Sequence, residues 1–302
     1  MSKSNKIIVL VDVSNLAWRC WYGNETLMTT TGNPSGHVFG AASSMFAFLR
    51  NHLSEKEATA CFCYDGENSV EYRRSILPEY KANRNPRDFN PVPEVSKLLS
   101  FWPGEHWLDP KKEADDMVAY LVQKYGDQDI PIVIISGDKD CWPLLKNKNV
   151  HIFSPNKGRY ITFEDFYKDY KIFGNTPEKI TLAKSLFGDS DNVKGVFRLL
   201  KAQVEPILNT IGVVTPDDFY RFIELNPTLS YMSANTRGKL SEAKERVYKN
   251  YQVILPMLNV NDEQCVKFTG TDKLLELYKM LEEFECATLL PQVAFLGPFA
   301  FS

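Results

Sequence analysis

Acidic residues follow three short apolar segments of this chain. IIVLVD ends at Asp12, ATACFCYD ends at Asp65, and IVIISGD ends at Asp138. Carboxylates that converge can hold hard divalent cations such as Mg²⁺ or Mn²⁺, because these ions prefer oxygen ligands. Two such ions about 4 Å apart can clamp a phosphodiester and activate water. The pattern therefore predicts metal-assisted hydrolysis of a phosphate ester.

Further acids in KEADDMVA, SGDKD and GDSDN extend the set of candidate metal ligands. They are Glu113, Asp115, Asp116, Asp140, Asp189 and Asp191. A single aspartate is more often a solvated charge or a helix cap than a metal ligand. Acids that repeatedly end buried strands are not explained in that way, and so many converging carboxylates would repel one another without bound cations.

The three apolar segments are short, rich in β-branched residues and without period-2 alternation, which predicts buried parallel strands. Helical patterns cover residues 37–53 and 109–126, with Asp109 as the N-cap and Pro110 as the first helical residue of the second. On that helix Glu113 and Asp115 border the apolar stripe, whereas Asp116 points away from it. This alternation predicts an α/β fold whose central, mostly parallel sheet is flanked by helices and whose site lies beyond the carboxyl ends of the strands.

After about residue 176 the strand signals fade and helical patterns dominate. We therefore expect an α/β core over residues 1–185 and a smaller C-terminal helical domain over 186–302. The formal net charge of −3 gives no sign of a nucleic-acid partner, although many metal-binding acids can mask a basic surface. The six cysteines form no CxxC pair, which disfavours a zinc site and favours a reduced, intracellular protein. The sequence shows neither a signal peptide nor an apolar run of membrane-spanning length.

Six motifs follow one another along the chain: VDVSNLAWR, CYDG, EYKANR, KEADDMVA, SGDKD and GDSDN. In this order they resemble the 5′-nuclease family, which comprises flap endonucleases, bacteriophage 5′-exonucleases and the 5′-nuclease domain of bacterial DNA polymerase I. The resemblance covers most of residues 6–196, and LLELYKMLEEFECATLL is similar to the closing helix of the family. It implies a PIN-like 5′-nuclease core with a helical arch or clamp around residues 70–112.

The resemblance also implies roles for individual residues. The nine acids named above correspond to the metal ligands of the family, with Asp12, Asp65, Asp115, Asp138 and Asp140 the strongest candidates. Lys81 and Arg84 match the basic pair at the gateway of the site and are the predicted catalytic residues, because they can hold the scissile phosphate. The predicted DNA-binding residues are Asn15, Arg19, Arg73, Arg74, Arg87, Lys194, Arg198 and Lys201.

Two motifs depart from the family pattern. GDSDN leaves one residue between its aspartates where the family usually has two, so one of the two acids is displaced; Asp189 is favoured as the retained ligand because it keeps its place after the apolar helix. The segment VKGVFRLLKAQVEPILNTIG keeps Gly195 but lacks the later glycines of the helix–hairpin–helix of the family. Backbone amides approach a phosphate less closely without glycine, which disfavours a monovalent-cation site and leaves point charges to grip a duplex.

The sequence therefore predicts a structure-specific 5′-nuclease, a 5′→3′ exonuclease or flap endonuclease, that uses two Mg²⁺ or Mn²⁺ ions. Expected substrates are DNA with 5′ flaps or free 5′ ends and RNA–DNA primers. We expect a monomer in the cytoplasm, of a bacterial host cell if the protein is phage-encoded, with replication proteins as possible partners.

Three alternative functions fit the sequence less well. A catalytically silent DNA-junction-binding module would not need the full acid set. A PIN-type ribonuclease would be shorter and would lack the YKANR segment. A phosphatase of the haloacid dehalogenase type needs an aspartate two residues after Asp12, where Ser14 stands.

Overall fold

A mixed sheet forms the centre of the computed structural model, which describes residues 6–53, 57–82, 88–172, 176–261 and 265–296. Within these residues the sheet has seven strands in the order β6-β5-β4-β1-β2-β3-β9. The strands are β1 (Lys6–Asp12), β2 (Glu57–Cys63), β3 (Gly104–Trp107), β4 (Ile132–Ile135), β5 (Val150–Ser154), β6 (Arg159–Tyr160) and β9 (Val266–Thr269). The five inner strands pair in parallel, and the edge strands β6 and β9 are antiparallel to their neighbours.

The three strands predicted from the apolar segments are confirmed as β1, β2 and β4, and they are neighbours. Asp12 is level with Cys63 on β2, and Val11 is level with Ile135 on β4. Parallel strands end at the same edge of the sheet, so the acids that follow these strands gather at one place.

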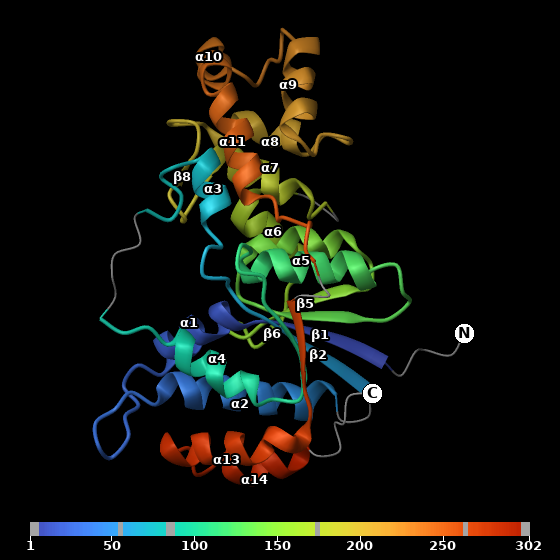
Figure 1. Cartoon of the computed structure of the whole chain (residues 1–302). Helices are drawn as coiled ribbons and strands as arrows, with labels where there is room; N and C mark the ends of the chain where they lie inside the picture. Colours follow the sequence, from blue (N-terminus) through green and yellow to red (C-terminus); the bar gives the residue numbers. More distant parts are fainter. Residues whose placement is uncertain (1–5, 54–56, 83–87, 173–175, 262–264, 297–302) are drawn as a thin grey trace.

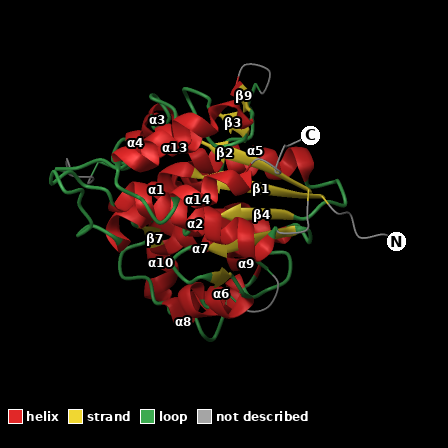
Figure 2. Cartoon of the chain, turned by 90° about the horizontal axis from the view of Figure 1, so that it is seen from below, coloured by secondary structure: helices red, strands yellow, loops and turns green. Residues whose placement is uncertain are grey.

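Helices cover both faces of the sheet (Figures 1 and 2). One face carries α1 (Val13–Gly23), α2 (Gly36–His52), α4 (Val92–Ser100), α13 (Leu274–Glu283) and α14 (Leu290–Val293). The other carries α5 (Ala114–Tyr125), the 3₁₀ helix η1 (Lys139–Lys146), α6 (Phe163–Tyr170) and α7 (Lys179–Phe187). No helix of the described residues is long and apolar enough to cross a membrane.

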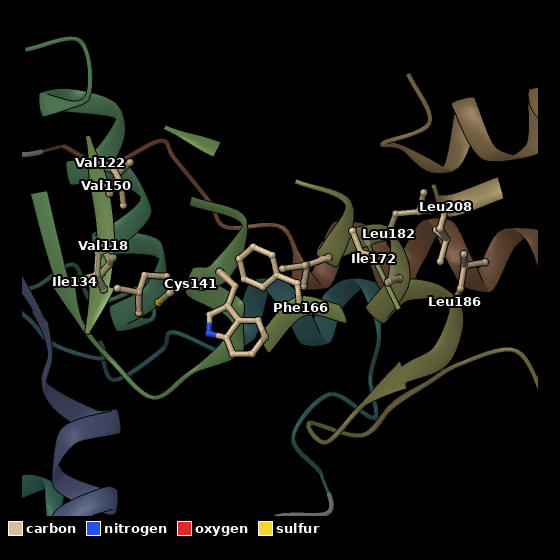
Figure 3. Close-up of a cluster of buried hydrophobic side chains, with 14 of the residues drawn as sticks. Val118, Val122, Ile134, Cys141, Val150, Phe166, Ile172, Leu182, Leu186 and Leu208 are labelled. Carbon is tan, nitrogen blue, oxygen red and sulfur yellow. The ribbon is translucent and has the colours of Figure 1, made fainter. Parts of the chain in front are cut away.

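Beyond α7 lies a helical part, seen at the top of Figure 1. It contains the short hairpin β7 (Gly188–Asp189) and β8 (Val193–Lys194), followed by α8 (Lys201–Leu208), α9 (Pro216–Leu225), α10 (Ala234–Glu242) and α11 (Lys244–Ile254). Its core is continuous with that of the sheet: one buried cluster runs from Ile134 and Val150 through Phe166 to Leu186 and Leu208 (Figure 3). The predicted division at residue 185 thus crosses a shared core.

The chain after α11 returns to the sheet, so the expectation of a helical domain over 186–302 does not hold for its last part. β9 pairs with β3, and Leu277, Met280 and Leu281 of α13 are buried against the face that carries α2. The remaining short helices are α3 (Glu71–Ile76), η2 (Thr271–Lys273) and η3 (Ala294–Leu296). The sequence VKFT of β9 is half-exposed, with Phe268 77% exposed, and such a strand has no apolar run to reveal it.

Helix α5 begins later than predicted, at Ala114 with Glu113 as its N-cap. Asp109 instead accepts a hydrogen bond from the Lys111 amide (2.9 Å), which forms a local turn that competes with a helix start. The turn packs against Gly66, where a Cβ atom would lie 2.1 Å from the carbonyl oxygen of Asp109. Only glycine permits this approach, which brings the start of α5 beside Asp65.

His106 on β3 is buried against the ring of Phe62, with ring centroids 5.0 Å apart. Its Nε2 lies 3.1 Å from the Trp102 carbonyl oxygen and its Nδ1 lies 2.8 Å from the Tyr64 hydroxyl. A neutral ring can donate to the first and accept from the second. Burial lowers the pKa of His106 from 6.5 to about 4.

Stability is therefore expected to fall in acid because of His106. The unfolded chain takes up the proton below pH 6.5 and the folded chain only near pH 4, so the stabilisation is complete above 6.5 and is lost as the pH falls between these values. Between pH 7.5 and 5, the wild type should lose about 2 kcal/mol more unfolding free energy than His106→Gln. Denaturant unfolding of both proteins at the two pH values measures this, and equal losses would contradict it.

Candidate functional site

Seven of the nine predicted acids surround one cavity of about 130 Å³ at the carboxyl ends of the strands. β1 ends at Asp12, Asp65 follows β2 after one residue, and Asp138 follows β4 after two. The acids that line the cavity are Asp12, Asp65, Glu113, Asp115, Asp138, Asp140 and Asp191, together with Lys81. The structure thus brings together the carboxylates that the strand pattern predicted to converge.

Local hydrogen bonds orient these carboxylates. Asp12 caps α1 by accepting from the Asn15 amide (3.0 Å) and also accepts from the Ser136 hydroxyl (3.1 Å). One oxygen of Asp65 accepts from the Ala114 amide (2.7 Å), and one oxygen of Asp138 accepts from the Asp140 amide (2.9 Å). The turn or helix that follows β1 and β4 thus supplies the amides that orient Asp12 and Asp138, whereas Asp65 is oriented by the start of α5.

The electrostatics of the cavity favour added cations. Burial raises the pKa of Asp12 well above its ordinary value, and repulsion by Asp65, Asp138 and Asp115 raises it further. Burial also raises the pKa of Asp138, which the nearby Lys184 partly offsets and the surrounding acids reinforce. A group in this environment is stabilised as a carboxylate only if positive charge is supplied.

The donor set fits hard divalent ions, because it consists of carboxylate oxygens. The Oδ1 atom of Asp115 is buried, lies 3.7 Å from Arg73 Nη2 and accepts no hydrogen bond within the described chain, so this acceptor can still take a ligand. Among the described residues, no group of three or more acidic, histidine or cysteine side chains is arranged to hold a metal ion. Ammonium groups lie among the acids instead: Lys81 contacts Glu113, and its Nζ lies 3.6 Å from Asp191.

Lys184 is a site residue that the motif analysis missed. Its buried ammonium group contacts both Asp140 and Asp189. The available signal was its position: it is the only cation within the apolar stretch ITLAKSLF, five residues before Asp189. A buried lysine next to acids is unusual enough to indicate a partner.

The two acids of GDSDN take different places. Asp191 lines the acid cavity, whereas Asp189 lines only an adjoining cleft of about 890 Å³ and pairs with Lys184. The Lys81 amide donates to the Asp191 carbonyl (2.9 Å), and Lys81 adopts a left-handed backbone with φ of 55°. This geometry favours Asp191 over Asp189 at the cavity, contrary to the preference drawn from the sequence.

Arg73 and Asp116 differ most from their predicted roles. Arg73 is 1% exposed and bonds to Glu113 and Asp116, so it is not placed to contact DNA. Asp116, expected to point outward, is fully buried against Arg73. α3 and α11 cover the side of α5 that a helical wheel assigns to solvent.

The other predicted basic residues remain at the surface or near the cleft. Asn15, Arg19 and Lys194 line the adjoining cleft, and Arg198 and Lys201 are exposed beyond the hairpin. The Nε atom of Arg74 donates to the Tyr80 carbonyl (3.2 Å), so Arg74 supports the segment before Lys81. The predictions for Arg84 and Arg87 fall outside the described residues.

A further hollow of about 550 Å³ meets the cleft at Gly195. Lys239 and Arg246 line it, with Glu242 as the acid among its lining residues. The Nζ atom of Lys239 donates to the Arg198 carbonyl (3.3 Å), which ties α10 to the segment that follows the hairpin. The ring of Phe197, 74% exposed, forms one wall beside these cations.

The sequence is similar to proteins of known family. Residues 7–171 match the family model of the 5′-3′ exonuclease N-terminal, resolvase-like domain. The chain is 28% identical over 294 residues to a 5′-3′ exonuclease of Aquifex aeolicus, covering 95% of both chains. It is 27% identical to DNA polymerase I of Caldicellulosiruptor bescii, where 91% of this chain spans 32% of that protein.

Solved structures share the fold. T5 5′-exonuclease with bound divalent zinc ions superposes with a TM-score of 0.63 at 19% identity, covering 96% of this chain and 98% of that chain. Flap endonuclease-1 from Methanococcus jannaschii gives a TM-score of 0.51 at 16% identity, covering 97% of this chain and 92% of that chain. Since the family model matches more than half of the sequence, the chain belongs to the 5′-3′ exonuclease family.

Proposed function

We propose that this chain is a structure-specific 5′-nuclease, a 5′→3′ exonuclease or flap endonuclease, that hydrolyses DNA phosphodiesters with divalent ions. The observation that carries the proposal is the convergence of seven carboxylates at the ends of three adjacent parallel strands. Relatives described as 5′-3′ exonucleases match nearly end to end, and a T5 flap endonuclease with the same fold is described in complex with DNA and metal ions.

Asp12, Asp65, Asp115, Asp138 and Asp140, with Glu113 and Asp191 beside them, would hold two Mg²⁺ or Mn²⁺ ions. When bound, such ions activate water and neutralise the leaving oxygen of a phosphodiester. Lys81 lies at the wall of the cavity, where its ammonium group can bind the scissile phosphate and stabilise the charge that develops on it.

The cleft and the hollow give the substrate a path away from the acids. Arg19 and Lys194 line the cleft, and beyond Gly195 the surface carries Lys239 and Arg246. Cations spaced along a groove match the phosphates of a nucleic-acid strand, and they can replace some of the grip that glycine-rich amides would provide. DNA with a 5′ flap or 5′ end is the proposed substrate, in the cytoplasm, with RNA–DNA primers as a further candidate.

Removal of a central acid should abolish cleavage. Asp138→Asn and Asp65→Asn should each lower the rate on a labelled 5′-flap duplex by about 100-fold or more, the loss typical when a group that stabilises transition-state charge is removed. Asp127→Asn, which changes an exposed acid after α5, is the matched control and should cut normally. EDTA should stop the wild type.

Intact Mg²⁺-dependent cleavage by Asp138→Asn would contradict the assignment. A wild-type protein that binds the flap but does not cut it in Mg²⁺ would instead support the alternative of a silent junction-binding module.

The basic hollow should contribute to duplex binding rather than to chemistry. Lys239→Ala and Arg246→Ala should each reduce the slope of log binding constant against log salt by about 1, as expected for the loss of one phosphate contact. Lys148 is exposed and lies just before β5, at the amino ends of the parallel strands and thus away from the acid cavity. Lys148→Ala is therefore the control variant. Fluorescence anisotropy in EDTA at several salt concentrations measures the slopes, and unchanged slopes would remove the hollow from the binding surface.

A further inference from the structure

Arg73 on α3 uses all three guanidinium nitrogens inside the protein. Its Nε donates to the Val253 carbonyl (2.8 Å) in the last turn of α11, where helix carbonyls lack intrahelical partners. Nη1 and Nη2 donate to the two oxygens of Asp116 (3.1 and 2.7 Å), and Nη1 also donates to Glu113. Such a bidentate pair between arginine and a carboxylate fixes the orientation of both side chains as well as their distance.

Asp116 accepts more hydrogen bonds than this pair alone. Besides the two from Arg73, it accepts one from the Met257 amide (2.7 Å) and one from the Glu113 amide (3.0 Å). A carboxylate offers about four lone-pair sites, and four donors occupy them here. A metal ion could bind Asp116 only by displacing one of these donors.

Asp115, the residue before Asp116, has fewer hydrogen bonds. Its Oδ1 accepts no hydrogen bond within the described chain, and its side chain lines the acid cavity. The acids at the start of α5 thus differ in their access to the cavity: Glu113 and Asp115 line it and also contact Arg73, whereas Asp116 does not line it and is paired with Arg73 through both oxygens.

The Arg73–Asp116 pair joins three segments. α3 leads into the loop that carries Lys81, α5 carries the cavity acids, and α11 with Met257 belongs to the helical part. α11 is itself tied to α7 and β8, because the Asn250 amide group donates to the carbonyls of Ser185 (3.0 Å) and Lys194 (2.9 Å).

We propose that Asp116 is a positioning residue and not a metal ligand: with Arg73 it fixes the first turn of α5 against α3 and α11, so that Glu113 and Asp115 face the cavity. The inference rests on the proposed function, because the acids it positions are those proposed to hold the metal ions. Removing one member of a buried ion pair leaves an uncompensated charge, whereas replacing both members does not.

The test compares Arg73→Gln, Asp116→Asn and the double variant, with Asp115→Asn as the standard for a lost ligand. Mg²⁺ binding is measured by calorimetry without DNA. Both single variants should weaken Mg²⁺ affinity by a similar factor, about tenfold, as is typical for groups that orient metal ligands. The double variant should be no weaker than the worse single one, because both changes break the same pair.

Thermal unfolding without metal gives a second readout. Each single variant should unfold at a lower temperature than the wild type, and the double variant, with its neutral amide pair, should recover part of the loss. Asp115→Asn should be destabilised less than either single variant, because its contact with Arg73 is longer (3.7 Å) and its removal relieves repulsion in the cavity. The kcat for flap cleavage should fall in both single variants while KM changes little, since the cavity acids and not the DNA contacts are displaced.

Two results would overturn the inference. In the first, Asp116→Asn loses a bound ion as Asp115→Asn does, while Arg73→Gln binds Mg²⁺ normally. In the second, the loss of Mg²⁺ affinity in the double variant equals the product of the losses in the two single variants. If the wild type cut no DNA, the proposed function would fail, yet the calorimetry and the unfolding would still test the pair.

Discussion

Repulsion among carboxylates at one edge of a parallel sheet is the constraint on which the rest of this structure depends. The strand order β4-β1-β2 places Asp138, Asp12 and Asp65 side by side, and burial makes the charges of Asp12 and Asp138 costly. The sheet supplies no cation at this edge, so positive charge comes from the elements around it: Lys81 from the loop after α3, and Lys184 from α7. Asp191, from the hairpin after α7, also lines the cavity, so the site is built by segments on both sides of the predicted boundary at residue 185.

Arg73 shows why a buried cation can be structural in such a site. Its pairing with Asp116 and Glu113 neutralises charge at the start of α5, and its bond to Val253 ties that charge to the end of α11. The pair thus combines charge balance with the placement of helices. The exposed cations Lys194, Arg198, Lys201 and Arg246 lie outside this network, toward the cleft and the hollow where a polyanion can reach them.

Sequence reasoning succeeded where a local signal determines the structure. Short β-branched runs ending in acids predicted β1, β2 and β4, and the positions of Asp12, Asp65 and Asp138 followed from the geometry of parallel strands. It failed where tertiary contacts decide. The run Tyr72–Arg74 gives no sign that one arginine is covered by α11 and the next is exposed, and a helical wheel for α5 cannot show that α3 closes over Asp116. The edge strand β9 was missed because half-exposed residues form no apolar run.

In the shortened GDSDN motif a single residue separates the two aspartates, and the two carboxylates take different places. Gly188–Asp189 pairs with Val193–Lys194, so only Ser190, Asp191 and Asn192 form the turn. Asn192 adopts a left-handed backbone (φ 63°), and its side-chain amide donates to the Glu79 carbonyl (2.7 Å). Together with the bond from the Lys81 amide to the Asp191 carbonyl, this fastens the turn to the segment that leads to Lys81. Asp191 is thereby held at the cavity while Asp189 stays with Lys184, so the tight turn places one of the two acids of the shortened motif at the cavity.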